Sequence, residues 1–288
     1  MDKFRVRDHD VFYLSYDEPN AEKNYADICN KIPWVKRVHG VKGSDAAHKA
    51  CAERAETERF TTVDGDNIID PKWLDVEIEF DMSTVDLTTS VVSWCGYNIV
   101  NGLIYGNGGL KCWPRQYVLD MKTHENADPD DVASQIDFCW DIRYLQMNQT
   151  YSDVYNNHTP QQAWRAGFRE GVKMSLSRGK KVANINTDIW HKNLQKLLIW
   201  MNVGTDVENG WWSCFGARQG CYLTMCTDWD TNITRDFKEL NNMWAENQAH
   251  SNIQEQMKTY SEALIDVGVN IGVQPLEPQQ SKWFKQVY

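Results

Sequence analysis

The sequence of 288 residues has no run of 18 apolar residues, no Cys-x-x-Cys pair, no internal repeat and no low-complexity linker. The first absence predicts that no helix spans a membrane. The second argues against a zinc site built on that spacing. The first ten residues, MDKFRVRDHD, lack the apolar stretch of a secretory signal. We therefore expect a cytoplasmic protein with no membrane partner, whose eight cysteines are mostly buried free thiols.

The chain also lacks an excess of basic residues. It has 30 Lys and Arg against 40 Asp and Glu, which gives a net charge of −10. This balance excludes an evenly basic coat for nucleic acid, although a local basic patch remains compatible with it. Hydrophobic residues make up 42% and charged residues 24%, as in a folded globular protein. The length allows two domains or one large α/β domain.

The first third of the chain alternates between strand-like and helix-like segments. Apolar and β-branched runs predict strands over residues 11–16, 34–39 and 59–63. Helical spacing predicts helices over residues 21–31 and 45–56, the second of which is rich in alanine. This alternation is typical of a parallel sheet with right-handed crossovers. Ligands of such sheets bind beyond the carboxyl ends of the strands.

Two polar clusters follow the predicted strands at those carboxyl ends, over residues 15–20 and 64–67. The second contains Asp64, Gly65 and Asp66. Two carboxylates separated by a glycine can both reach one site, and hard oxygen ligands suit Mg²⁺ or Mn²⁺. A divalent ion there would neutralise a diphosphate. The alternative is a solvated Asp-Gly turn, while the spacing of an EF-hand is missing.

The rest of the chain is less regular. A glycine-rich stretch over residues 101–114 predicts a loop that approaches a sugar or phosphate closely, without the pattern of a Walker A or Rossmann motif. Pro160 opens a helix over residues 160–176. The segment 204–220 is predicted to be rich in turns, and residues 235–265 are predicted to be helical.

Several distinctive segments follow one another in a fixed order. They are FYLSYDEPN (12–20), RVHGVKG (37–43), AAHKA (46–50), VDGD (63–66), IVNGL and YGNGGLK (99–111), and AWRAGFREG (163–171). Together they resemble the GT-A-fold, DxD-containing glycosyltransferases, over about residues 8–220. The resemblance is strongest to a bacteriophage group that includes DNA-base glycosyltransferases.

This resemblance implies an α/β fold of GT-A-like (Rossmann-like) type, with a mixed, mainly parallel sheet flanked by helices and a helical C-terminal extension. It implies a nucleotide-sugar-binding half over residues 8–125, an acceptor-binding half over 126–230, and the extension and tail over 231–288. The implied activity is metal-dependent transfer of a sugar from a nucleoside-diphosphate sugar, with UDP as the expected nucleotide, to an acceptor hydroxyl. The implied cofactor is Mn²⁺ or Mg²⁺.

The resemblance also assigns roles on the donor side. The first cluster would line the pocket for base and ribose, two lysines and a histidine would contact phosphate and sugar oxygens, and Asp64 and Asp66 would bind the metal. The purely structural alternatives are a capped turn for the first cluster, a solvated helix face for Lys49 and a packed side chain for His48. The expected donor-binding residues are Ser15, Tyr16, Glu18, Asn20, Lys42, His48, Lys49, Asp64, Gly65, Asp66, Gly108, Gly109 and Lys111.

A carboxylate must take the proton of the acceptor hydroxyl if the transfer inverts the anomeric carbon, whereas a retaining transfer needs no dedicated base. We prefer Asp206 and, after it, Asp141 as this catalytic residue. A solvated turn explains the acids around Asp206 equally well. The wider set of candidates for a base or third metal ligand is Asp137, Asp141, Asp206, Glu208 and His191.

A basic stripe marks the predicted helix 160–176. Arg165, Arg169 and Lys173 recur every four residues and therefore share one face. With Trp211 and Trp212 as stacking surfaces, they are the expected acceptor-binding residues, and phage DNA carrying a hydroxymethylated pyrimidine is the expected acceptor. The stripe can also be an ordinary solvated face. Two alternative functions stay open: transfer to a glycan or protein, and a non-catalytic nucleotide- and metal-binding module of a virion.

Overall fold

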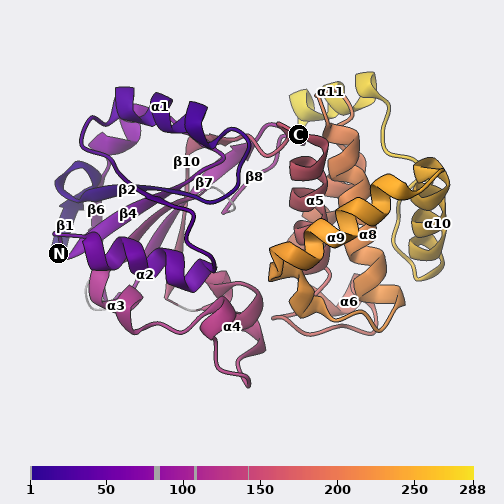
Figure 1. The fold of residues 1–288 in the computed structure, drawn as a ribbon. Coiled ribbons are helices and arrows are strands. Elements are labelled where there is room, and N and C mark those ends of the chain that lie inside the picture. Colours follow the sequence, from indigo (N-terminus) through magenta and orange to yellow (C-terminus); the bar gives the residue numbers. More distant parts are fainter. Residues whose placement is uncertain (1, 81–84, 107–108, 142) are drawn as a thin grey trace. The chain divides into compact units, whose positions relative to one another are not determined.

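The computed structural model describes residues 2–80, 85–106, 109–141 and 143–288. The chain divides into two compact units, shown in Figure 1. The sheet unit comprises Met1–Ile99 and Leu103–Tyr155, and the helical unit comprises Val100–Gly102 and Asn156–Tyr288. The expected halves over residues 8–125 and 126–230 and the extension over 231–288 stay predictions. Strand β10 (Tyr144–Val154) belongs to the sheet, and the helices beyond residue 230 pack with those before it.

The sheet unit contains a mixed sheet of eight strands, in the order β3-β2-β4-β9-β7-β10-β5, with β8 paired to β7. Five strands run in one direction: β2 (Asp10–Ser15), β3 (Lys36–His39), β4 (Arg59–Asp64), β7 (Val91–Asn98) and β10. Three run in the other: β5 (Asn67–Ile69), β8 (Ile104–Tyr105) and β9 (Leu110–Pro114). A small separate sheet pairs β1 (Asp2–Arg5) with β6 (Glu77–Phe80). The expected mixed, mainly parallel α/β sheet is confirmed.

Helices α1 (Ala21–Lys31) and α2 (Ser44–Arg54) cover opposite faces of this sheet, as Figure 1 shows. The alternation of side chains along β2 supplies both cores. Tyr13 packs in one core with Ile28 of α1, and Phe12 packs in the other with Cys51 of α2. The shorter helices of this unit are α3 (Arg115–Asp120), α4 (Val132–Ile136), η1 (Val6–Asp8), η2 (Pro71–Asp75), η3 (His124–Asn126) and η4 (Phe138–Trp140).

The glycine-rich stretch 101–114 is not the single loop that we expected. Strands β8 and β9 lie within it, and β9 pairs with both β4 and β7. The glycines hid these strands, since glycine weakens the strand pattern on which a sequence-based prediction depends. The buried side chains of Leu110, Cys112 and Trp113 fix β9 in the middle of the sheet.

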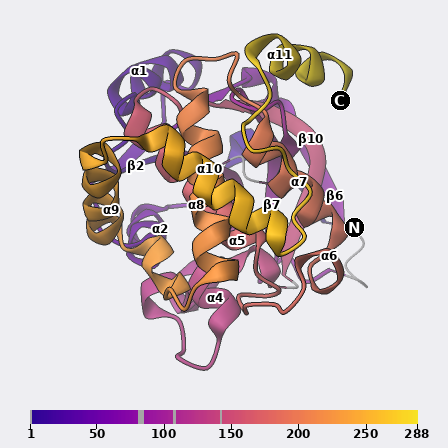
Figure 2. The same ribbon diagram turned by 90° about the vertical axis from the view of Figure 1, so that its right-hand side faces the viewer.

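Within the helical unit, Figure 2 shows α10 crossing over α8. The segment 204–220 was wrongly predicted to be rich in turns, because α8 occupies most of it. The helices predicted over residues 160–176 and 235–265 are confirmed, the first as α5 and the second as α9 followed by α10.

None of the helices in the described ranges is long and apolar enough to span a bilayer. The helices are α5 (Pro160–Met174), α6 (Ile185–Asp188), α7 (His191–Asn202), α8 (Gly210–Cys226), η5 (Thr231–Arg235), α9 (Phe237–Ala249), α10 (Ile253–Asp266) and α11 (Pro278–Val287).

Helices α5 and α8 pack backbone against backbone. A Cβ atom on Gly167 of α5 would lie 2.0 Å from Ser213 O of α8. A Cβ atom on Gly171 would lie 2.3 Å from Ala217 O of α8. The converse holds for Gly216 and Gly220, whose Cβ atoms would lie 2.2 and 2.3 Å from backbone carbonyl oxygens of α5. The glycines that suggested turns in α8 therefore serve close helix packing.

Arg218 joins three parts of the helical unit from a fully buried position on α8. Its Nε donates to Met201 O at 3.0 Å, and its Nη1 donates to Ser261 Oγ at 2.5 Å and to Gly272 O at 2.8 Å. Burial lowers the pKa of Arg218 to about 10, so the guanidinium still keeps its charge at neutral pH. The helical unit is thus organised around α8.

We predict that Gly171→Ala destabilises the protein. In an open helix this change stabilises by about 1 kcal/mol. Here the added Cβ meets the α8 backbone at 2.3 Å, and overpacking costs about 1–3 kcal/mol. Urea denaturation followed by circular dichroism measures the change. Gly272→Ala is the control, because its Cβ has its nearest neighbour at 3.4 Å. A more stable Gly171→Ala protein would contradict the close packing.

Candidate functional site

The carboxyl ends of β2, β3 and β4 lie at one edge of the sheet. Strand β2 pairs in parallel with both neighbours, with Ser15 opposite His39 and Leu14 opposite Asp64. The two polar clusters therefore meet at this edge, as the parallel pairing predicted. The sequence brings them together because each follows an apolar strand and each strand points the same way.

The Asp64-Gly65-Asp66 turn is held by its backbone. The Tyr13 hydroxyl donates to Gly65 O at 2.7 Å, and Asn24 Nδ2 donates to the same oxygen at 3.0 Å. The Tyr155 N–H donates to Asp66 O at 2.7 Å. Because these donors come from β2, α1 and the end of β10, the turn is part of the folded framework, unlike an exposed solvated turn.

A third carboxylate, Glu18, lies against this turn. A Cβ on Gly65 would lie 2.7 Å from Glu18 Oε2, so a side chain at position 65 would displace the Glu18 carboxylate. The Tyr16 N–H donates to Glu18 Oε2 at 2.7 Å. Glu18 thus lies beside Gly65, and its expected role in the pocket for base and ribose stays a prediction.

Burial and neighbouring negative charges raise the pKa values of Asp66 and Glu18. Burial, followed by the charges of Asp64 and Glu18, raises the pKa of Asp66 to about 7. Burial also raises the pKa of Glu18, with further contributions from Asp17 and Asp64. Each negative charge makes ionisation of the next less favourable. A cation at this place would relieve the repulsion.

The donor set fits Mg²⁺ or Mn²⁺. Carboxylate oxygens are the hard ligands that these ions prefer, and the Asp64 side chain is 39% exposed. Among the described residues, no group of three or more His, Cys, Asp or Glu side chains is close enough to enclose a metal ion. Asp64 and Asp66 would therefore hold the ion together with water and ligand oxygens, as Mg²⁺ sites often do.

Strand β9 and the residues before it form the other side of Asp64. The Asp64 N–H donates to Gly109 O at 3.1 Å, and a Cβ on Gly109 would lie 2.2 Å from Asp64 Cβ. Lys111 Nζ lies 3.8 Å from Asp64 Oδ2, and its side chain is 13% exposed. Gly109 and Lys111 thus join the site, whereas Gly108 lies outside the described residues.

His48 offers this site a hydrogen-bond acceptor. Its Nδ1 lies 2.7 Å from Ser44 O, and since a carbonyl only accepts, Nδ1 carries the proton. Burial lowers the pKa of His48, so the ring is neutral and Nε2 holds a lone pair. Nε2 is buried and has no hydrogen-bond partner among the residues that the structure describes. After burial and the Ser44 hydrogen bond, the charges of Asp64 and Lys111 also influence the pKa of this ring.

Other residues of the expected donor site have structural contacts. Lys49 Nζ pairs with the fully buried Asp45 at 2.7 Å. Asn20 precedes α1 but does not cap it through its side chain, and its Nδ2 instead donates to Tyr155 O at 3.0 Å. Tyr16 is exposed at the edge, and Lys42 is exposed in the loop between β3 and α2.

Sequence reasoning missed His39 and the contribution of Arg37. Ser15 Oγ lies 3.0 Å from His39 Nδ1 and accepts a hydrogen bond from Arg37 Nε at 3.2 Å. Arg37 also pairs with Glu22 of α1, and its guanidinium lies 4.6 Å from the centre of the Tyr25 ring. His39 ends the second parallel strand, so the rule that located the two polar clusters could have located it.

The two preferred candidates for a base are both ion-paired. Arg143 donates to Asp141 through Nε at 2.8 Å and lowers the pKa of Asp141. Asp206 Oδ2 lies 2.6 Å from Lys285 Nζ of α11, with both side chains about nine-tenths buried at 10% and 11% exposure. Asp141 lies in the sheet unit and Asp206 in the helical unit. Their catalytic role stays a prediction.

The basic stripe of α5 makes contacts within the helical unit. The guanidinium groups of Arg165 and Arg169 lie 4.5 and 5.6 Å from the centre of the Phe237 ring at the start of α9. Lys173 Nζ lies 2.7 Å from Glu170 Oε1. These side chains are partly buried, so the stripe is not an ordinary solvated face.

Trp211 and Trp212 belong to an aromatic cluster on α8. The Trp211 ring stacks on Phe215 at 5.5 Å between centres, and Trp212 meets Trp244 of α9 edge to face at 5.0 Å. Both side chains keep partial exposure. Their packing explains their presence within the unit, and a role in stacking on an acceptor stays a prediction.

No protein-family model matches the sequence, and no curated protein is similar enough to count as a match. Two of the solved structures that share limited similarity with it are glycosyltransferases. A glycosyltransferase involved in glycosylation of the major capsid of PBCV-1 is 14% identical, with a TM-score of 0.27 over 48% of this chain and 81% of that one. The mannosyltransferase PcManGT from Pyrobaculum calidifontis, in complex with GDP-Man and Mn²⁺, is 13% identical, with a TM-score of 0.34 over 92% and 87%. Similarity at this level does not determine the reaction or the site residues of this chain.

We predict that Asp66→Asn changes the pH dependence of stability. The pKa of Asp66 is about 7 in the folded protein, above the ordinary value of 3.8. The folded state therefore binds more protons than the unfolded state between these values. The contribution of Asp66 to the free energy of unfolding is lost as the pH rises from about 4 through 7. Asp66→Asn removes this loss. Denaturation at a series of pH values measures the free energy of unfolding of both proteins.

Glu53→Gln, on the exposed surface of α2, is the control, and its free energy of unfolding should fall with rising pH as in the wild type. In Asp64→Asn this fall should be smaller, because the Asp64 charge contributes to the raised pKa of Asp66. An unchanged profile in Asp66→Asn would show that this carboxyl does not titrate near pH 7.

Proposed function

We propose that this protein is a metal-dependent glycosyltransferase that moves a sugar from a nucleoside-diphosphate sugar, with UDP as the expected nucleotide, to an acceptor hydroxyl. The observation that carries the proposal is the pair of carboxylates Asp64 and Asp66 on a held turn at the carboxyl edge of β2 and β4, with the Glu18 carboxylate beside Gly65. A solvated turn needs no such framework. An acid with a pKa near 7 is typical of functional sites.

The residues of this edge divide by chemistry among the parts of the donor. Asp64 and Asp66 would hold the divalent ion, which neutralises charge on the departing diphosphate when it is bound. The Lys111 ammonium, 3.8 Å from Asp64, and the exposed Lys42 can reach phosphate oxygens. His48 Nε2 can accept a hydrogen bond only from a ligand group that donates, such as a hydroxyl of the sugar or ribose.

The ring and hydroxyl groups at the ends of β2 and β3 suit a nucleoside. Tyr16 is exposed and offers a stacking surface. The Ser15 and His39 side chains are joined by a hydrogen bond and are supported by Arg37, so they present fixed polar groups at the same edge. We assign the base and ribose to this part of the site.

In the proposed reaction, the acceptor oxygen bonds to the anomeric carbon while the bond from that carbon to the diphosphate oxygen breaks. The nucleoside diphosphate leaves with the electron pair, and the acceptor proton passes to a base or to the leaving group. Asp141 is a weak candidate for the base, because Arg143 lowers its pKa and a good base needs a pKa near the working pH. Asp206 is held by Lys285.

For the acceptor we propose a hydroxymethylated pyrimidine of phage DNA. Support comes from the cations at the end of α5, where Arg178, Lys180 and Lys181 are exposed in a chain of net charge −10. Exposed cations of this kind bind the phosphate backbone. In the alternative transferase, the acceptor is a glycan or protein and the donor site is the same. Binding of nucleotide and Mn²⁺ without turnover would identify a non-catalytic module.

We predict that Asp64→Asn and Asp66→Asn each reduce release of UDP from a UDP-sugar in the presence of Mn²⁺ by about 100-fold or more. Loss of the metal removes several kcal/mol of charge stabilisation, and each 1.36 kcal/mol corresponds to about tenfold in rate. A coupled assay for UDP measures the rate, and EDTA should have the same effect on the wild type. Glu53→Gln is the matched control on α2. Full activity in EDTA would rule out the metal mechanism.

We further predict that Arg165→Ala combined with Arg169→Ala weakens binding of hydroxymethylated DNA. If each arginine neutralises one phosphate, the slope of log affinity against log salt falls by about two. Fluorescence anisotropy at several salt concentrations measures the slope. Lys258→Ala is the control, because Lys258 is exposed on α10 away from the stripe. An unchanged slope would discard α5 as the contact with DNA.

A further inference from the structure

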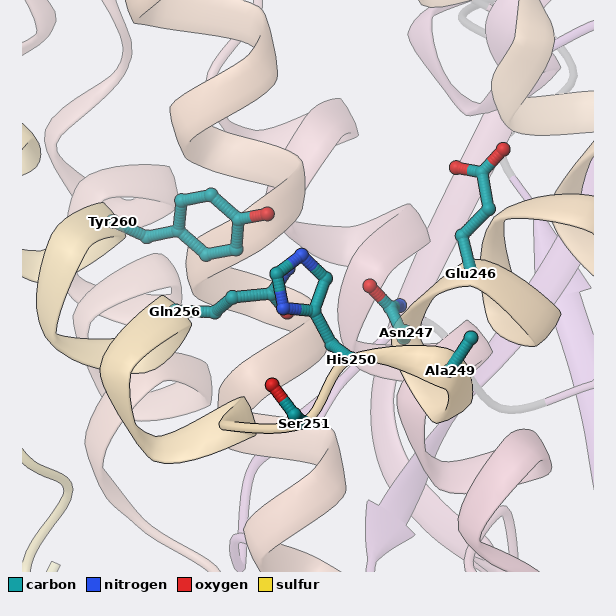
Figure 3. Close-up of a pocket in the computed structure, with 7 residues that line it drawn as sticks. All are labelled: Glu246, Asn247, Ala249, His250, Ser251, Gln256 and Tyr260. Carbon is teal, nitrogen blue, oxygen red and sulfur yellow. The ribbon is translucent and has the colours of Figure 1, made fainter.

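The helical unit contains an open pocket of about 560 Å³ where α9 ends and α10 begins. Figure 3 shows its side chains, with Tyr260, Gln256 and His250 close together and Glu246 directed away from them. The polar side chains that line it are Glu246, Asn247, His250, Ser251, Gln256 and Tyr260. The volume falls within the range of about 300–1,000 Å³ that is typical of small-molecule sites.

One wall of the pocket is fixed by a network of amides. Gln219 and Asn247 exchange two hydrogen bonds of 3.0 Å. Gln219 Oε1 also accepts from Trp164 Nε1 at 2.7 Å, and Gln219 Nε2 donates to the Tyr260 hydroxyl at 3.4 Å. The wall therefore joins α5, α8, α9 and α10. A ligand would meet preorganised groups here.

Two groups of the pocket keep unused hydrogen-bonding capacity. Gln256 Oε1 is buried and has no hydrogen-bond partner in the described ranges of the chain, which is unfavourable for a polar atom. The Tyr260 hydroxyl accepts from Gln219, and its own proton has no acceptor within the part of the chain that the structure describes. A free acceptor and a free donor on the same helix suit a ligand hydroxyl, which both donates and accepts.

Charge and ring geometry limit the class of ligand. Neither lysine nor arginine lines the pocket, and its acidic residue, Glu246, disfavours a phosphate or a phosphodiester. The Tyr260 ring is held by stacking on Tyr222 at 4.7 Å between centres, and it adds an apolar surface of the kind that packs against C–H groups. We propose that this pocket binds a neutral saccharide of one or two rings.

Saturation-transfer NMR with maltose, cellobiose and lactose tests this site on the full chain. At least one of the three is expected to bind the wild type. Tyr260→Phe and Gln256→Ala each weaken that binding by about tenfold, because each removes one hydrogen bond. Gln254→Ala is the matched control, since Gln254 is exposed on α10 and does not line the pocket. Thermal melting checks that each variant is folded.

The site would be overturned if none of the three sugars binds, if both pocket variants bind as the wild type does, or if inorganic phosphate displaces the sugar. The readout needs neither nucleotide nor metal. Asp66→Asn should therefore bind the sugar as the wild type does. Failure of the saccharide site would appear as loss of sugar binding, and failure of the proposed transferase activity would appear in the assay for UDP release.

Discussion

The burial of Asp66 beside the charges of Asp64 and Glu18 is the constraint on which the proposed activity depends. The backbone of the turn that carries Asp64 and Asp66 is held by Tyr13, Asn24 and the Tyr155 N–H. The result is an acid whose pKa is raised to about 7, first by burial and then by its charged neighbours. In the proposed function a divalent ion would offset these negative charges and would make the site attractive to a diphosphate. The sheet, its crossover helices and β9 all serve to keep this geometry.

The helical unit is built on a different constraint, which is the close approach of α5 and α8. Four glycines let the two backbones touch, and Arg218 then ties α8 to the end of α7, to α10 and to the segment before α11. The same packing explains why the basic stripe is less available than a helical wheel suggests. Arg165 and Arg169 lie over Phe237, so contact with an acceptor competes with a contact inside the protein.

The two units thus offer different chemistry to ligands. The edge of the sheet combines carboxylates with Lys111 and a neutral His48, which suits a charged ligand that brings a metal. The pocket at α9 and α10 combines amides, a hydroxyl and an aromatic ring, which suits a neutral ligand with many hydroxyl groups. These two sets of groups lie in separate structural units.

The sequence alone determined the strand and helix alternation of the first 64 residues and the placement of Asp64 and Asp66 at the end of a strand, because short-range hydrophobic patterns decide those features. It could not show that Glu18 joins them, that Lys49 is engaged by Asp45, or that residues 101–114 and 204–220 contain strands and a helix. Those outcomes depend on contacts between segments far apart in the chain. Glycine is the clearest case: the same residue type predicts a turn locally, and only tertiary packing decides that Gly216 and Gly220 lie inside a helix against another backbone.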